Sequence, residues 1–117
     1  MKVFVVDDNE DICTLVETLL VPEGYSVTCC VNPMIAEEMI RKTKPNLIIT
    51  DMLMSGVDGL TLIKNLKTRK ATKDIKIILM SAHPQTLKLG KEAGADDYLA
   101  KPFEITELIY KVRKIIQ

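Results

Sequence analysis

The stretch VFVVDDNE, residues 3–10, runs from four apolar residues directly into two adjacent aspartates. A continuous apolar run of this kind is typical of a strand that is covered on both faces of a parallel sheet. Asp7 and Asp8 then follow, and no basic residue lies near them in the sequence. Their like charges repel, and a hard divalent cation with oxygen ligands would remove that conflict. The alternative is an exposed, hydrated strand end.

Four further apolar runs follow the first, and amphipathic stretches separate them. We expect strands at residues 2–7, 25–30, 46–50, 75–80 and 97–100. We expect helices around 12–19, from the N-cap Asn32 and Pro33 to about Arg41, from the N-cap Asp58, from Pro84 to near Gly94, and around 105–116. Strict alternation of strands and helices predicts right-handed crossovers and one parallel sheet with helices on both faces.

Composition narrows the class of protein. The chain has 117 residues, is 47% hydrophobic and has a mean hydropathy of +0.11, which suits one globular domain. No apolar run is long enough to span a bilayer, and the chain shows no signal peptide. Three cysteines, two of them adjacent, make a poor disulfide framework. We therefore predict reduced thiols, a cytoplasmic location and no membrane partner.

The net charge is zero, but the charges are unevenly distributed. Residues 1–58 hold ten acidic and four basic residues, whereas residues 59–117 hold six acidic and twelve basic residues. No dense basic stripe stands out in the second half, so we predict that this domain does not bind nucleic acid directly.

Ligands of such parallel sheets bind at the carboxyl ends of the strands. The polar residues expected at those ends are Asp7, Asp8, Asp51, Ser81 and Lys101. A carboxylate beside a metal can attack phosphorus, and a hydroxyl and an ammonium can bind phosphoryl oxygens. The bland alternatives are a loop hydroxyl for Ser81 and a solvent-directed ammonium for Lys101. A glycine-rich phosphate loop and a G-x-S-x-G elbow are absent from the sequence, which argues against a nucleotide site and a serine hydrolase.

Four segments in fixed order, VVDDNE (5–10), IITDMLMSGVDG (48–59), LMSAH (79–83) and GADDYLAKPF (94–103), resemble the receiver domain of two-component response regulators, including the chemotaxis type. The resemblance covers residues 1–117 as one domain. It implies a flavodoxin-like three-layer (βα)5 sandwich, with a five-stranded parallel sheet in the order 2-1-3-4-5.

The resemblance also implies a role for each site residue. Asp51 would be the phosphoacceptor, and Ser81 and Lys101 would bind the phosphoryl group. Ser81 and Tyr98 would form the switch, and Leu53 and His83 would tune dephosphorylation. Mg²⁺, or alternatively Mn²⁺, would be held by Asp7, Asp8, Asp51 and the Leu53 carbonyl. The Lys101-Pro102 bond would be cis. For Tyr98 the residues alone leave a half-buried strand tyrosine as the alternative, and for His83 a loop histidine without a role.

The function that follows is a phosphorylatable switch and not an enzyme acting on other substrates. A histidine kinase or histidine phosphotransfer protein would donate the phosphoryl group, and the surface of the fourth helix, fifth strand and fifth helix would then control an unknown partner or a fused output domain. The chain would be a monomer or a phosphorylation-dependent dimer. A non-phosphorylated interaction module of the same fold is the alternative. Two departures stand out: Ser55 replaces a common proline, and the segment from Ser81 to Lys101 is short for the family.

Overall fold

The computed structural model describes residues 1–83 and 85–117. Within these residues, five parallel strands form one sheet in the order β2-β1-β3-β4-β5. The strands are β1 (Lys2–Val6), β2 (Ser26–Cys30), β3 (Leu47–Asp51), β4 (Lys76–Ser81) and β5 (Asp97–Ala100). The helices are α1 (Glu10–Leu20), α2 (Ala36–Thr43), α3 (Gly59–Thr68), α4 (Thr86–Ala93) and α5 (Ile105–Ile116), with the short 3-10 turns η1 (Val21–Glu23) and η2 (Pro33–Ile35). The predicted fold and strand order are confirmed.

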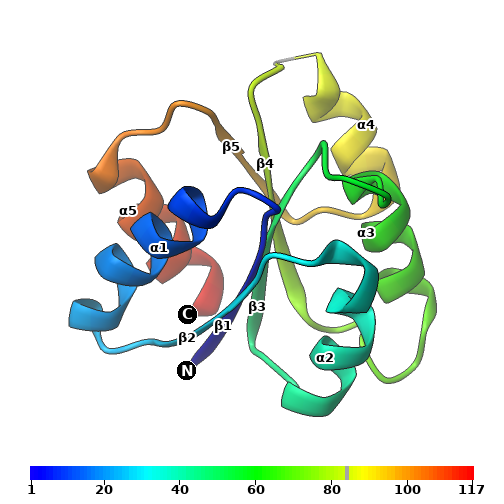
Figure 1. Ribbon diagram of the computed structural model, residues 1–117, viewed down its shortest axis with the longest axis horizontal. Helices are drawn as coiled ribbons and strands as arrows, with labels where there is room; N and C mark the ends of the chain where they lie inside the picture. Colours follow the sequence, from blue (N-terminus) through cyan, green and yellow to red (C-terminus); the bar gives the residue numbers. More distant parts are fainter. Residues whose placement is uncertain (84) are drawn as a thin grey trace.

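Helices cover both faces of the sheet. Helices α1 and α5 lie on one face, and α2, α3 and α4 lie on the other (Figure 1). Successive residues of β1 alternate between the two layers: Val3 and Val5 pack on the α1/α5 side, whereas Phe4 and Val6 pack on the other side. Each is at most 1% exposed. A strand covered on both faces needs apolar residues at every position, which is why the opening run is continuous.

The polar ends of two strands are fixed by strand pairing. The strands β3 and β4 each run one residue further than predicted, because Asp51 pairs with Met80 and Ser81 pairs with Ala100. Asp51 and Ser81 are therefore the last residues of strands and not the first residues of loops. Their backbones are held by the ladder at the carboxyl edge of the sheet.

Side-chain caps set several helix ends. The Asp58 carboxylate accepts a hydrogen bond from the Leu60 amide at 2.7 Å and caps α3, as predicted. Asn32 caps the turn η2 instead of α2, which begins later, at Ala36. The predicted proline start of the fourth helix, Pro84, lies outside the described residues. That helix ends at Ala93, and its C-cap is Gly94, whose φ of 113° is a conformation that glycine adopts without strain. Among the described residues, no helix has the length and apolarity to cross a membrane.

Candidate functional site

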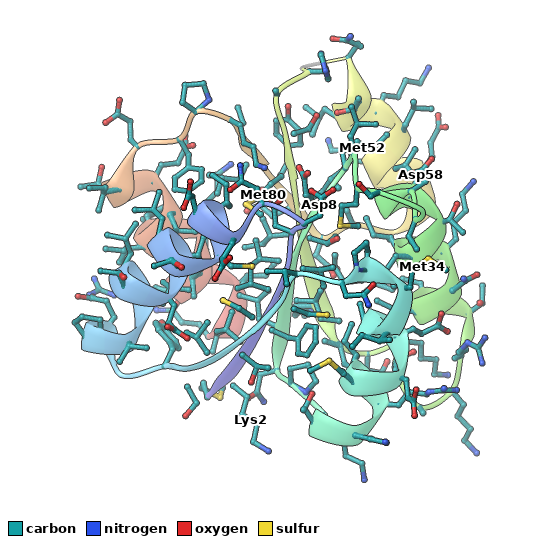
Figure 2. The ribbon with its side chains drawn as sticks, viewed as in Figure 1. Lys2, Asp8, Met34, Met52, Asp58 and Met80 are labelled. Atoms are coloured by element: carbon teal, nitrogen blue, oxygen red, sulfur yellow. The ribbon has the colours of Figure 1, made fainter. Side chains whose placement is uncertain are left out.

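Three carboxylates gather at the carboxyl edge of the sheet. Asp7 and Asp8 follow β1, Asp51 ends β3, and one oxygen of each lies within 4.8 Å of the others. Figure 2 shows Asp8 at the same end of the sheet as Met52, the residue after Asp51. The Asp7 side chain is fully buried, so the hydrated strand end is wrong for this residue, whereas Asp8 is exposed. A buried carboxylate needs a compensating charge.

Lys101 supplies a positive charge to this cluster. Its ammonium lies 2.8 Å from Asp7 Oδ2 and 3.1 Å from Asp51 Oδ1, and its side chain is only 19% exposed. The alternative of a solvent-directed lysine is therefore wrong. No basic residue lies near the acidic pair in the sequence. Lys101 is 94 residues away from Asp7 along the chain, and the fold brings the two together. Three carboxylates and one ammonium still leave an excess of two negative charges.

The local environment shifts the pKa values of two of these groups. Burial raises the pKa of Asp51; the hydrogen bond from Lys101 lowers it and the charge of Asp7 raises it, and the result lies above the ordinary value. Burial lowers the pKa of Lys101, but its hydrogen bonds with Asp7 and Asp51 outweigh burial, so that its pKa is raised. Lys101 therefore stays charged at neutral pH. Ionising the Asp51 carboxylate costs free energy that a bound cation would reduce.

Local hydrogen bonds orient the two adjacent aspartates. Asp7 Oδ1 accepts a bond from the Asn9 amide at 3.0 Å, and Asp8 Oδ2 accepts bonds from the Ser55 amide at 2.9 Å and the Ser55 hydroxyl at 3.0 Å. A proline at position 55 could donate neither bond. Sequence reasoning noted the serine but missed this contact. Carboxylate oxygens fixed at this spacing suit a hard cation such as Mg²⁺, so the residues present fit the ion that the sequence predicts.

Asp51, one of the three clustered carboxylates, opens onto a pocket of about 140 Å³. Its lining residues are Asp51, Met52, Leu53, Ser81, Ala82, His83 and Lys101. The Lys101 amide donates to the Ser81 carbonyl at 2.8 Å, which holds the two residues at the same level of adjacent chain segments. Leu53, at 62% exposure, forms part of the rim. The structure thus brings the predicted phosphoacceptor together with both predicted phosphoryl-binding side chains.

The Ser81 hydroxyl is bonded to the loop that follows it. Ser81 Oγ accepts a hydrogen bond from the His83 amide at 3.0 Å and lies 2.8 Å from the Thr86 hydroxyl. The half-buried Tyr98 places its hydroxyl 3.5 Å from the Ser81 carbonyl and 3.4 Å from the His83 carbonyl, at the long limit of hydrogen bonding. Tyr98 and Ser81 therefore meet the same loop, as a switch pair would. Sequence reasoning missed Thr86.

The family model described as the response regulator receiver domain matches residues 3–113. The chain belongs to this family. Receiver domains are signalling switches of two-component systems rather than enzymes in the usual sense. The Lys101-Pro102 bond is cis, as the resemblance implied.

Several relatives illustrate the similarity of this receiver domain to known proteins. Protein PetR of Rhodobacter capsulatus is 39% identical over 115 residues, which cover 97% of this chain and 47% of PetR. The DNA-binding dual master transcriptional regulator RpaA of Synechocystis is 31% identical over 118 residues, 99% of this chain and 49% of RpaA. A solved structure of a response regulator from Chloroflexus aurantiacus has a TM-score of 0.93 and 36% identity, covering 98% of this chain and 96% of that chain. The chain spans about half the length of the curated relatives it matches.

Proposed function

We propose that this receiver domain accepts a phosphoryl group on Asp51 from a histidine kinase or a histidine phosphotransfer protein, in a reaction that depends on Mg²⁺ or, alternatively, Mn²⁺. The observation that carries the proposal is the position of Lys101, whose ammonium contacts both Asp7 and Asp51 beside a pocket of about 140 Å³. A structural ion pair needs one carboxylate per lysine. Here three carboxylates face one ammonium, and the remaining negative charge favours the binding of a cation.

Each side chain has a role in this reaction. Asp7, Asp8, Asp51 and the Leu53 carbonyl would hold the ion, which when bound offsets negative charge on the phosphoryl oxygens. An Asp51 oxygen attacks the phosphorus of the donor's phosphohistidine; the P–O bond forms as the P–N bond breaks, and the imidazole leaves with the electron pair. The Lys101 ammonium pairs with one phosphoryl oxygen, and the Ser81 hydroxyl donates to another.

The switch follows from where Ser81 is bonded. To reach a phosphoryl group on Asp51, its hydroxyl leaves the loop of His83, which Tyr98 also contacts. The face formed by α4, β5 and α5 then changes through a shift between two packings. Leu53 and His83 border the pocket, so we assign them a role in controlling how water reaches the phosphoryl group.

Partners and location complete the proposal. The output is a partner protein or a segment beyond residues 1–117, which we treat as one receiver domain; the doubled length of PetR and RpaA supports the second arrangement. We propose a cytoplasmic location, which the three free cysteines support, and a monomer or a phosphorylation-dependent dimer. We propose that this domain itself does not bind nucleic acid directly.

Labelling by acetyl phosphate or a phosphorylated kinase tests the assignment. We expect one phosphoryl group per chain with Mg²⁺, none with EDTA and none in Asp51→Asn. The control is Asp58→Asn, which changes an aspartate that caps α3 and should be labelled normally. Full labelling of Asp51→Asn would refute the assignment. If the wild type binds no beryllofluoride in the presence of Mg²⁺, the alternative of a non-phosphorylated interaction module is the better interpretation.

A further inference from the structure

We propose that Thr86 is a positioning residue that holds the Ser81 hydroxyl on the β4–α4 loop, and thereby sets how readily the domain adopts its phosphoryl-bound arrangement. The proposal rests on the proposed function, because it concerns the hydroxyl that would bind the phosphoryl group. It adds a third residue to the predicted pair of Ser81 and Tyr98.

The contacts of Thr86 are short and buried. Its Oγ1 lies 2.8 Å from Ser81 Oγ and 2.7 Å from the His83 carbonyl oxygen. Thr86 is 8% exposed and Ser81 is 1% exposed, so water does not readily replace these bonds. Within the part of the chain that the structure describes, the Ser81 hydroxyl makes no hydrogen bond with Asp51 or Lys101. Its described bonds go to His83 in the loop and to Thr86, the first residue of α4.

The His83 carbonyl is the centre of this arrangement. It accepts hydrogen bonds from the Thr86 amide at 3.0 Å and from the Thr86 hydroxyl, and the hydroxyls of Ser81 and Tyr98 lie at 3.3 and 3.4 Å. The His83 carbonyl oxygen therefore contacts both predicted switch residues and the first residue of α4. Any movement of the Ser81 hydroxyl toward the pocket breaks its bond with Thr86, so the first residue of α4 loses this contact.

The start of α4 places Thr86 beside Ser81. The helix begins at Thr86, five positions after Ser81, and Gln85 makes no side-chain cap at its start. The Thr86 hydroxyl is thus at the helix end that faces the Ser81 loop.

The expected effect of removing the hydroxyl has a definite sign. Thr86→Val keeps the shape of the side chain but loses both bonds of the hydroxyl. The bond to the His83 carbonyl does not require Ser81, whereas the bond to Ser81 Oγ exists only while Ser81 is on the loop. The loop-bound arrangement is therefore weakened more than the phosphoryl-bound arrangement. A typical buried hydrogen bond then predicts about fivefold tighter binding of Mg²⁺-dependent beryllofluoride, which mimics the phosphoryl group.

Calorimetric titration with beryllofluoride and Mg²⁺ tests the proposal in the whole chain. Thr86→Ser keeps a hydroxyl and should bind like the wild type. The matched control is Thr72→Val: Thr72 is 1% exposed and its hydroxyl donates to the Leu66 carbonyl at 2.6 Å, away from the pocket lining. That variant should lose stability without a change in affinity. In a Ser81→Ala background, Thr86→Val should have no further effect, because the shared bond is already gone.

A second measurement separates this proposal from the proposed function. The His83 amide donates to Ser81 Oγ, so its hydrogen exchange reports departure of the hydroxyl without any ligand. We expect severalfold faster exchange in Thr86→Val and unchanged exchange in Thr86→Ser. If the wild type binds no beryllofluoride, the proposed function fails, and exchange alone decides on Thr86. Unchanged exchange, unchanged or weaker beryllofluoride affinity, or an effect that persists without the Ser81 hydroxyl would overturn the role of Thr86.

Discussion

Replacing Asp51, the proposed phosphoacceptor, should make the metal-free protein more stable. In Asp51→Asn the side chain keeps its shape but loses its charge, and Lys101 remains paired with Asp7 at 2.8 Å. The excess negative charge of the cluster falls from two to one. The three carboxylates repel one another more than Lys101 compensates, and this substitution removes part of that repulsion.

The magnitude follows from the distances. At an effective dielectric constant of about 20, unit charges 4.8 Å apart repel by about 3.5 kcal/mol, and Asp51 lies within that distance of both Asp7 and Asp8. On the same scale, Lys101 at 3.1 Å attracts the Asp51 carboxylate by about 5.4 kcal/mol. Two repulsions exceed one attraction by about 1–2 kcal/mol on that scale, and burial adds to the cost. We therefore expect Asp51→Asn to raise the free energy of unfolding by about 1–2 kcal/mol.

The pH dependence has a definite direction. The folded-state pKa of Asp51 lies above its ordinary value of 3.8, so the folded protein keeps a proton that the unfolded chain has lost. The stability that this group contributes to the wild type falls as the pH rises from 3.8 through the raised pKa, and is constant above it. The advantage of Asp51→Asn should therefore be absent at acidic pH below that window and should grow as the pH rises through it.

Magnesium should offset the advantage. A ligand at about 100 times its dissociation constant stabilises the folded state by about 2.7 kcal/mol, and the variant lacks one of the proposed ligands. The wild type should therefore gain more from Mg²⁺ than the variant, enough to become at least as stable.

Urea unfolding followed by far-UV circular dichroism measures these differences, since the chain has no tryptophan. The titrations compare wild type, Asp51→Asn and the capping control Asp58→Asn, with EDTA and with Mg²⁺, at neutral and acidic pH. The control should change stability little, because asparagine caps helices as well as aspartate does. A variant that is less stable than the wild type in EDTA at neutral pH, or an advantage that persists unchanged in acid, would refute the electrostatic reasoning.

Substitutions at three further positions test the same site. Lys101→Met should lower the free energy of unfolding in EDTA by about 3 kcal/mol, because it leaves the buried Asp7 unpaired; urea titration that detects no loss would contradict this role. Ser55→Pro should weaken Mg²⁺ binding in calorimetry roughly tenfold, and Ser55→Ala less, since alanine keeps the amide that binds Asp8; tighter binding would show that Ser55 competes with the ion. Gly59→Ala places a Cβ 2.3 Å from the Asp51 carbonyl oxygen, so thermal unfolding should reveal a loss of about 2 kcal/mol; a wild-type melting temperature would show that the backbone yields there.

The sequence predicted the framework of the site because the geometry of a parallel sheet determines it. Continuous apolar runs locate strands, and alternation with helices brings their carboxyl ends to one edge. Asp7, Asp51, Ser81 and Lys101 therefore converge whatever the details of the loops. The predicted ends of β3 and β4 were one residue too early, because a polar side chain does not prevent the backbone of Asp51 or Ser81 from pairing.

Contacts made by loops could not be predicted in the same way. The bonds of Ser55 with Asp8 and of Thr86 with Ser81 depend on the loop path at the scale of a hydrogen bond, which residue type does not encode. The family resemblance helped little here, since both positions belong to the segments where this chain departs from the usual pattern. The late start of α2 has a similar origin: Asn32 and Pro33 do initiate helical turns, but the first turn is 3-10.

The position of Lys101 links binding of the proposed cation to binding of the phosphoryl group. Its ammonium is shared between Asp7 and Asp51, and Asp7 is completely buried. If Lys101 turns to a phosphoryl oxygen, Asp7 loses the charge that compensates it, and an uncompensated buried carboxylate is costly. Another positive charge must then lie beside Asp7, where the proposed cation site already has its ligands. Phosphoryl transfer to Asp51 should therefore depend on the cation twice: for neutralising the incoming oxygens, and for releasing Lys101 to bind them.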